Sequence, residues 1–444
     1  MVRRTLMAAA LVISIAAVIG HYARNHLEAR FAAAAPETVD PAAQMRAVVR
    51  SYRHLAHLSY ETAYHSAGRL RRHIQALTAQ PSAQRLAAAR HAWRDARVDY
   101  AQTEVFRFGN WIVDDWETSI NAWPVDEGVL DYVTADYAAS PGNPLARHNL
   151  VSAASVTIDG ITLHTDPVSW PQLKFIHGGS DVEANVVLGY HAIEFLLWGQ
   201  DHNPNGPGQR PWTDFDGAAC TSGPHAAPAA HCRRRGRLLG LMAEHLYSEL
   251  GRMTLNWAGN NPGSYGLHLA EGDVKEGLRR MLFGMIRLAG DELAGERMQV
   301  ALLSHAPEEE QDCFSDDTHQ SLYFNARGIA NIYFGRYARP GGVSPYAAAS
   351  SLATLAESLD PELAATLLTR FDSVETVMAE IRRQGQQGAT FDRLIEPGNT
   401  AGHALMTEGI AALQALGVAL ESLAVRLELG PINPQAPQFD RVSS

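Results

Sequence analysis

Apolar residues recur at steps of three and four along most of this 444-residue chain, which is the period of amphipathic α-helices. The pattern fills residues 41–80 and 82–108, and Ser82, which follows Pro81, is an expected N-cap. It returns in the second half, over residues 233–257, 272–303, 318–337, 345–358, 361–384 and 400–429. No segment shows the sustained two-residue alternation of a strand, so the sequence predicts an all-α fold.

Turn-forming residues divide these predicted helices into two sets. Residues 110–178 are rich in Asp, Pro, Gly and Trp, which predicts loops and short helices, and residues 201–232 form a stretch rich in Gly, Pro and Ala. We therefore expect a first helical bundle over residues 36–200, a connecting loop at 201–232 and a second bundle over 233–430. The Pro-containing residues 431–444 are expected to form a loosely ordered tail.

The composition excludes several classes of protein. With 46% hydrophobic and 19% charged residues the chain is an ordinary globular protein. The 48 acidic residues outnumber the 37 Lys and Arg, which gives a net charge of -11. Nucleic acid is therefore not an expected partner, and the acidic body suits cations better than anions.

The N-terminus carries the pattern of an export signal. Arg3 and Arg4 precede an apolar run over residues 6–20, which is short for a spanning helix. We interpret residues 1–35 as a signal peptide or an uncleaved N-terminal anchor, and contact with a membrane is expected only through this segment. In an oxidising compartment Cys220 and Cys232 could form a disulfide and leave Cys313 as the odd thiol, although three unpaired cysteines are the alternative.

The strongest local signal for chemistry is a charged pair inside a nearly uniform apolar segment. Residues 182–200 should form a buried helix, within which His191 and Glu194 stand three residues apart on one face. Burying both is costly unless they are paired or bind a metal ion, and a His with a carboxylate is a ligand set for iron, zinc or manganese. A satisfied ion pair without metal is the alternative.

Acidic residues elsewhere could complete such a site. Glu104 and Asp126 are the preferred additional ligands, with Glu127 as a further candidate. The alternatives are a salt bridge from Glu104 to Arg107, and a helix cap or first-turn charge for the other two. Polar residues before the 318–337 helix form a second set of cleft candidates, for which an N-cap is the alternative: Ser315, Asp316, Asp317 and His319.

Common hydrolase motifs are absent from the sequence. It contains no HExxH, no HxxEH and no GxSxG. The sequence therefore does not predict a standard zincin or a serine hydrolase with the GxSxG motif.

Several stretches together resemble one family of exported bacterial proteins. The motif GxHxxE is met by Gly189, His191 and Glu194, and further similar stretches follow the same order: AWRDARVDYAQTEVFRFGN, NAWPVDEGVLDYV, RPWTDFD, AGERM and CFSDDTHQSLYFNARGIANIYFGRY. In these features the chain resembles the imelysin family, which includes insulin-cleaving membrane protease and iron-regulated protein A. One departure is Asp317, where the resemblance leads us to expect Asn.

The resemblance implies two helical bundles related by approximate internal duplication, with the GxHxxE site near their junction. It also implies a periplasmic protein, soluble or anchored, that takes part in iron acquisition with a membrane-bound uptake partner. We therefore expect a metal-binding protein in which iron is the preferred ion and zinc the alternative. A zinc metallopeptidase, with an acid such as Glu127 activating water, and a non-catalytic module for peptides or other ligands are the competing hypotheses.

Overall fold

The computed structural model describes residues 40–138, 140–203, 206–338, 345–430 and 432. The expected signal or anchor at residues 1–35 lies outside this part of the chain, as does nearly all of the expected tail at 431–444. The described residues from Met45 onwards group as one compact unit. The division into two bundles, joined at 201–232, therefore stays a prediction.

The first half of the chain is helical, as predicted. Its elements are α2 (Pro41–Ala79), α3 (Ala83–Ala101), η1 (Glu104–Phe106), α4 (Trp111–Asn121), α5 (Glu127–Leu130), α6 (Trp170–Ile176), η2 (Gly179–Asp181) and α7 (Gly189–Trp198). Ser82 caps α3 by accepting a hydrogen bond from the backbone N–H of Arg85 at 3.3 Å. The helix expected to reach Phe108 ends instead at Ala101, and a single 3-10 turn, η1, follows it.

The second half is also mostly helical. Its helices are η3 (Trp212–Phe215), α8 (Ala229–Asn256), α9 (Tyr265–Glu271), α10 (Val274–Ile286), η4 (Arg287–Gln299), α11 (Val300–Ser304), η5 (Pro307–Glu309), α12 (Thr318–Phe334), α13 (Leu352–Leu359), α14 (Pro361–Gln386), α15 (Phe391–Ile395) and α16 (Thr400–Arg426). The segment expected as one helix over 272–303 is α10, η4 and α11 in succession, and η4 is π-helical.

The expectation that the chain has no strands was wrong in detail, although the fold is all-α. Within the described residues, three pairs of short antiparallel strands lie between the helices: β1 (Ser155–Ile158) with β2 (Ile161–His164), β3 (Thr221–Ser222) with β4 (His225–Ala226), and β5 (Arg336–Tyr337) with β6 (Tyr346–Ala347). Each strand has four residues or fewer. Strands this short leave too few residues for an alternating pattern to be recognised.

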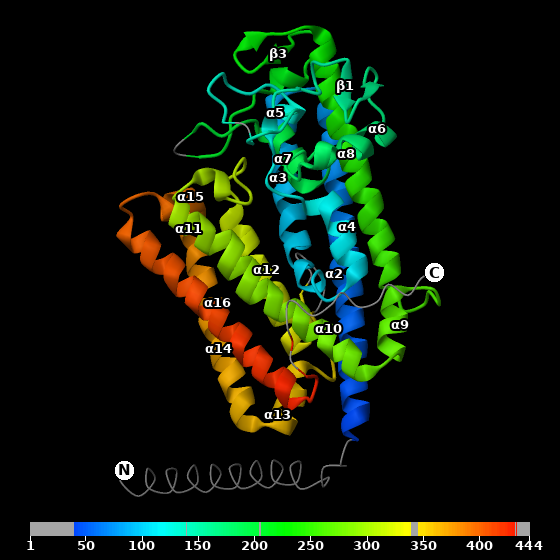
Figure 1. The fold of residues 1–444 in the computed structure, drawn as a ribbon, viewed down its shortest axis with the longest axis vertical. Helices are drawn as coiled ribbons and strands as arrows, with labels where there is room; N and C mark the ends of the chain where they lie inside the picture. The colour runs from blue at the N-terminus through cyan, green and yellow to red at the C-terminus, as the bar shows by residue number, and fades with distance from the viewer. Residues whose placement is uncertain (1–39, 139, 204–205, 339–344, 431, 433–444) are drawn as a thin grey trace, which may run out of the picture. The chain divides into compact units, whose positions relative to one another are not determined.

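Helix packing brings distant parts of the sequence together around α12. Helices α12, α14 and α16 lie side by side (Figure 1). Helix α16 also packs against η4. Helix α12 reaches α3 as well, and its Gly328 approaches the end of α3 so closely that a Cβ there would lie 2.8 Å from the carbonyl oxygen of Gln102. This close contact joins the first half of the chain to the second.

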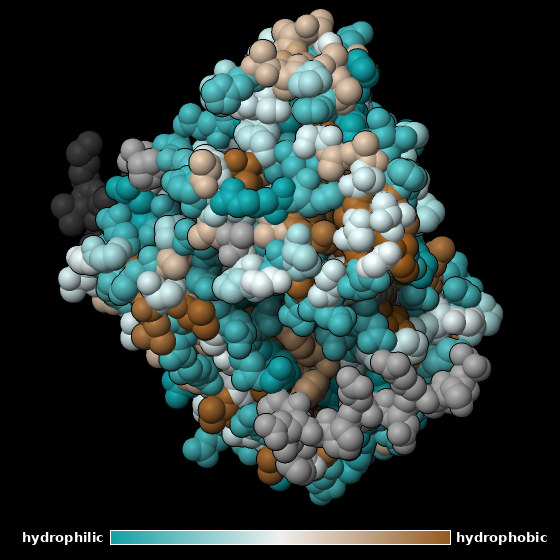
Figure 2. Space-filling model, turned by 45° about the horizontal axis from the view of Figure 1, so that its top comes forward, coloured by the Kyte–Doolittle hydropathy of each residue, from teal (hydrophilic) through white to brown (hydrophobic). Residues whose placement is uncertain are grey.

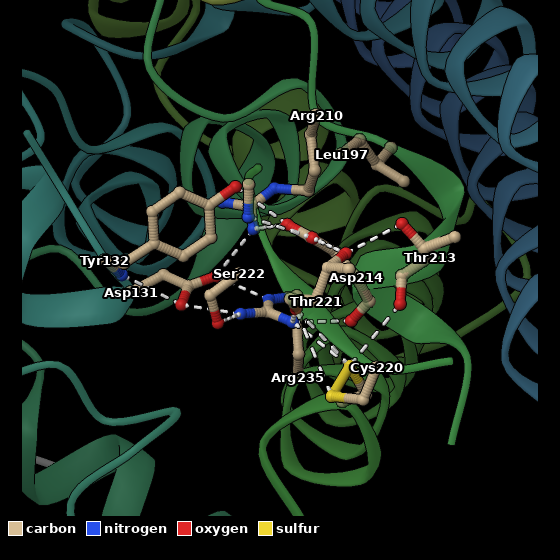
Figure 3. A network of polar contacts seen from close by, with 12 residues as sticks. Asp131, Tyr132, Leu197, Arg210, Thr213, Asp214, Cys220, Thr221, Ser222 and Arg235 are labelled. Carbon is tan, nitrogen blue, oxygen red and sulfur yellow. Dashed lines mark hydrogen bonds and ion pairs between the residues drawn. A yellow bond between two sulfur atoms is a disulfide. The ribbon is translucent and has the colours of Figure 1, made fainter. Parts of the chain in front are cut away.

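A buried network of arginines and aspartates fixes the loop after α7 to the start of α8 (Figure 3). Asp131 accepts hydrogen bonds from Arg210 at 2.7 Å and from Arg235 at 2.5 and 3.0 Å. Arg210 also donates to Asp214 at 2.9 Å, and Tyr132 donates to the same carboxylate at 2.7 Å. Burial alone would raise the pKa of Asp131, but Arg210 and Arg235 outweigh burial and lower it.

A disulfide also joins this loop to the first turn of α8. Cys220 and Cys232 are joined, and Arg235 follows Cys232 by one helical turn at the start of α8. Cys313 is a free thiol.

Surface hydrophobic residues are scattered. The face in Figure 2 is mainly hydrophilic, with hydrophobic residues in small separate groups. Among the described residues, one helix, α16, is long and apolar enough to cross a membrane by length and composition. This helix packs against α14 and η4, and 44% of its apolar window is buried.

The buried network generates a stability prediction. We expect Asp131→Asn to lower the free energy of unfolding by about 3–5 kcal/mol, because the substitution leaves two buried guanidinium groups without their shared counter-charge. The measurement is equilibrium unfolding in urea. The matched control is Asp291→Asn, which removes a half-exposed partner of Arg287 and should cost less than about 1 kcal/mol. Equal effects of the two substitutions would contradict the importance of the buried network.

Candidate metal site

Helix α7 begins at a glycine that no other residue can replace without strain. Helix α7 is shorter than the helix predicted over residues 182–200. It starts at Gly189, whose φ is +87°. A Cβ at this position would lie 2.3 Å from the carbonyl oxygen of Ile120 at the end of α4. Gly189 therefore allows α7 to start directly against α4, and every residue of the helix is buried.

His191 and Glu194 lie on the same face of α7, where they meet a third side chain from the other half of the chain. His191 Nδ1 is 3.2 Å from Glu194 Oε2 and 3.5 Å from Asp312 Oδ1. One donor atom from each of the three residues lies within 4.8 Å of the others. All three side chains have zero exposure. We call these residues the His191 cluster.

The segment that carries Asp312 is fixed both to α12 and to α7. The Asp312 N–H donates to Thr318 Oγ1 at 2.8 Å, and Ser321 Oγ donates to Asp312 Oδ2. Ser315 then donates twice to Glu194 Oε1, from its backbone N–H at 2.9 Å and from its hydroxyl at 2.7 Å. The turn before α12 therefore positions one cluster residue and hydrogen-bonds another.

Arg97 links the His191 cluster to a second buried ion-pair group. Its Nε donates to Asp312 Oδ1 at 3.0 Å, and its Nη1 donates to Asn121 Oδ1 at 2.5 Å. The same guanidinium lies 3.8 Å from Glu104, which also accepts a hydrogen bond from Arg297. Since Arg97 is itself fully buried, its charge acts on the cluster with little screening by water.

The protonation of the cluster is set mainly by burial. Burial, and then the charges of Arg97 and Arg297, lower the pKa of His191 well below its usual value, so the imidazole is neutral. Burial and the nearby carboxylate of Asp312 raise the pKa of Glu194 well above its usual value, against the opposing effect of Ser315. A neutral imidazole beside two crowded carboxyl groups is an environment that a cation would stabilise.

The donor set fits a transition metal. One imidazole nitrogen and two carboxylate oxygens are ligands that iron, zinc and manganese all accept. His191 Nδ1 is the ring nitrogen that faces both carboxylates, while the other ring nitrogen, Nε2, is buried without a hydrogen-bond partner in the described residues. The residues present therefore fit a metal ion, whose identity they do not select.

Glu104 and Asp126 are not among the converging donors. Glu104 is joined to Arg297 and reaches the cluster only through Arg97. Asp126 is the N-cap residue before α5 and accepts hydrogen bonds from Tyr137 at 2.6 Å and from Asn143 at 2.7 Å. Asp126 is thus satisfied within its own loop, and ligand roles for these two acids remain predictions from sequence.

The other candidates have separate surroundings. Glu127 is largely buried, and burial raises its pKa to about 7. Asp317 lies 3.4 Å from Arg94, and burial raises its pKa to about 7. His319 packs against Gly385 of α14, where a Cβ would lie 2.2 Å from its ring, and burial lowers its pKa to about 4. Of the four cleft candidates before and in α12, Ser315 hydrogen-bonds a side chain of the His191 cluster, and Asp317 donates its backbone N–H to the carbonyl oxygen of Asp312 at 3.3 Å.

Asp316 belongs to a different group. Burial and the charges of Asp201 and Asp392 raise its pKa to about 8. It lies with Glu310 and Asp392 rather than with His191.

Asp312 was missed by the sequence analysis. It lies in the acidic stretch before α12 whose later residues were selected, and nothing in its spacing distinguishes it from them. Only the packing of this stretch against α7 identifies it.

Comparisons with known proteins agree with the fold. The family model for imelysin, a peptidase M75 family, matches residues 56–420. No curated protein matches the chain. The crystal structure of a protein described as an iron-regulated protein A precursor, from Parabacteroides distasonis, is similar with a TM-score of 0.62 and 18% identity, covering 89% of this chain and 97% of that one. An imelysin-like protein from Psychrobacter arcticum is similar with a TM-score of 0.53 and 16% identity, covering 85% and 94%.

The start of α7 can be tested by adding one methyl group. Gly189→Ala should lower the free energy of unfolding by about 2–4 kcal/mol, because it combines a positive φ with a backbone clash. Gly240→Ala in α8 is the control, since nothing lies within 4 Å of a Cβ there, and it should be neutral or slightly stabilising. Chemical unfolding followed by circular dichroism gives both values. An unchanged free energy of unfolding in Gly189→Ala would contradict the close approach of α7 to α4.

Proposed function

This chain belongs to the imelysin family, and we propose that it is an exported protein that binds one metal ion through His191, Glu194 and Asp312. The observation that carries the proposal is the convergence of three donor atoms within 4.8 Å in a site that excludes water. Two of the donors come from one turn of α7 and the third from the turn before α12. A bound ion would therefore join segments from the two halves of the chain.

The charges around the site support a cation rather than a simple ion pair. A neutral His191 cannot compensate either carboxylate, and Arg97 is shared between Asp312 and Glu104. Without a cation, the least costly state keeps a proton on Glu194, in line with its raised pKa. A metal ion would replace that proton and give Glu194 and Asp312 a common counter-charge.

Iron is the preferred ion. The nitrogen and oxygen donors accept iron, zinc and manganese alike, and iron is favoured because the similar Parabacteroides protein is described as iron-regulated. Its description as a precursor and the signal-like residues 1–35 support an exported, periplasmic location. On this basis we propose a role in iron acquisition, with a membrane-bound uptake partner.

The burial of the site bears on the competing hypothesis of a peptidase. A catalytic zinc ion keeps an open coordination position that faces its substrate. The three side chains of the His191 cluster have no exposed surface, and this arrangement supports stable ion binding over peptide hydrolysis. Hydrolysis of an unfolded peptide that depends on Glu194 would favour the peptidase.

Metal content tests the site directly. We expect the purified protein, loaded with Fe²⁺ or Zn²⁺ and then desalted, to retain one ion per chain by elemental mass spectrometry. His191→Ala, Glu194→Gln and Asp312→Asn should each lose it, because each removes one of three donors. Asp126→Asn should retain it, which separates the structural assignment from the ligand set predicted from sequence. Full metal content in the Asp312→Asn variant would refute the assignment.

A further inference from the structure

A second group of carboxylates lies close to the His191 cluster but is not part of it. Glu310 follows η5, Asp316 lies in the turn before α12, and Asp392 is in the first turn of α15. One oxygen from each residue lies within 4.8 Å of the others. We call these three residues the acidic cluster. Since they come from three separate segments, the folded chain brings like charges together by tertiary packing.

Two oxygens of the acidic cluster are buried and lack any partner. Glu310 is only 1% exposed, and its Oε1 accepts no hydrogen bond in the described residues. Oδ1 of Asp392 is also buried without a partner. Buried polar atoms are satisfied in most folded proteins, so two orphaned oxygens in one small group indicate a ligand that the protein chain does not itself supply.

The acidic cluster is not joined to basic side chains by direct ion pairs in the described part of the chain. Among the described residues, no Arg, Lys or His forms an ion pair with Glu310, Asp316 or Asp392, and the nearby Arg94 pairs with Asp317 instead. A fourth carboxylate, Asp201 in the loop after α7, interacts with both Asp316 and Asp392. Arg94 lowers the pKa of Asp316 but is outweighed by burial and by the charges of Asp201 and Asp392. These acids must therefore either keep protons or share a cation that replaces those protons.

We propose that Glu310, Asp316 and Asp392 form a binding site for a hard divalent cation, calcium in the first place, with Asp201 as an additional oxygen donor. The donors are all carboxylate oxygens, with no imidazole or thiol among them, which favours calcium over zinc or ferrous iron. Calcium also tolerates irregular arrangements of oxygens from separate loops, whereas magnesium demands near-ideal octahedral geometry. The acidic cluster shares no ligand residue with the site proposed at His191.

Bound calcium would stabilise the segment that carries the rest of the site. Glu310 and Asp316 lie on either side of Asp312 and Ser315 in the sequence. Asp312 belongs to the His191 cluster, and Ser315 hydrogen-bonds Glu194 of that cluster. The ion would tie this segment to α15 and to the loop after α7. Calcium at the acidic cluster is therefore expected to act on the fold around the His191 cluster without contacting it.

Thermal unfolding of the chelator-treated, full-length protein tests the proposal with calcium chloride as the probe. We expect the midpoint to rise by about 3 °C when calcium is roughly 100-fold above its dissociation constant. Sodium chloride at equal ionic strength should not reproduce the rise, because specific ligation rather than screening causes it. No calcium-dependent rise, or an equal rise with sodium chloride, would overturn the proposal.

Charge-neutralising variants locate the effect. Asp392→Asn and Asp316→Asn should abolish the calcium-dependent rise, and Asn suits the positive φ of +55° at position 316. Without calcium, both variants should unfold at or above the wild-type midpoint, since each removes repulsion between carboxylates. Glu308→Gln, an exposed acid of the same loop, is the matched control and should keep the full rise. A full rise in Asp392→Asn would overturn the assignment.

One further variant separates this proposal from the one made for the His191 cluster. His191→Ala should lose the transition metal and retain the calcium-dependent rise, because His191 supplies no ligand to the acidic cluster. Loss of the calcium-dependent rise in His191→Ala would place calcium at the His191 cluster. It would refute calcium binding at the acidic cluster. Failure of the transition-metal proposal alone would leave the calcium result unchanged.

Discussion

The buried ion pair between Arg97 and Asp312 is the interaction on which the rest of the site depends. It connects α3, in the first half of the chain, to the turn before α12, in the second half. Two fully buried charges are stable only if their remaining hydrogen-bonding capacity is satisfied, and here Asn121 and Ser321 contribute to that satisfaction. This ion pair holds the Asp312 carboxylate beside His191.

The local parts of the fold could be predicted from the sequence because their causes are local. The periodicity of α2, the capping of α3 by Ser82 and the buried character of α7 depend on residues within a few turns of each other. The start of α7 could not be placed in this way. It is set by the approach of Gly189 to the carbonyl group of Ile120, a contact between segments that the pattern of apolar residues does not encode.

Two of the three residues of the candidate site could be selected from the sequence. His191 and Glu194 were recognisable because a charged pair in an apolar helix requires a partner. That partner, Asp312, stands among similar acids in the same stretch, and its choice depends on which carboxylate the turn before α12 directs towards α7. Glu104 was selected for its charge, and the structure places that charge against Arg297, which no spacing in the sequence reveals. Long-range pairing of buried charges is the information that a single sequence lacks.

The short segment from Glu310 to Asp316 contributes carboxylates to both groups of acids. A displacement of this segment would change the distances within both groups together, because only one residue separates Glu310 from Asp312 along the backbone. Ligands that bind at two such sites are thermodynamically linked, and the linkage is reciprocal. Occupation of either site would then alter the affinity of the other by the same factor, so the calcium level of the compartment would adjust the retention of the transition metal.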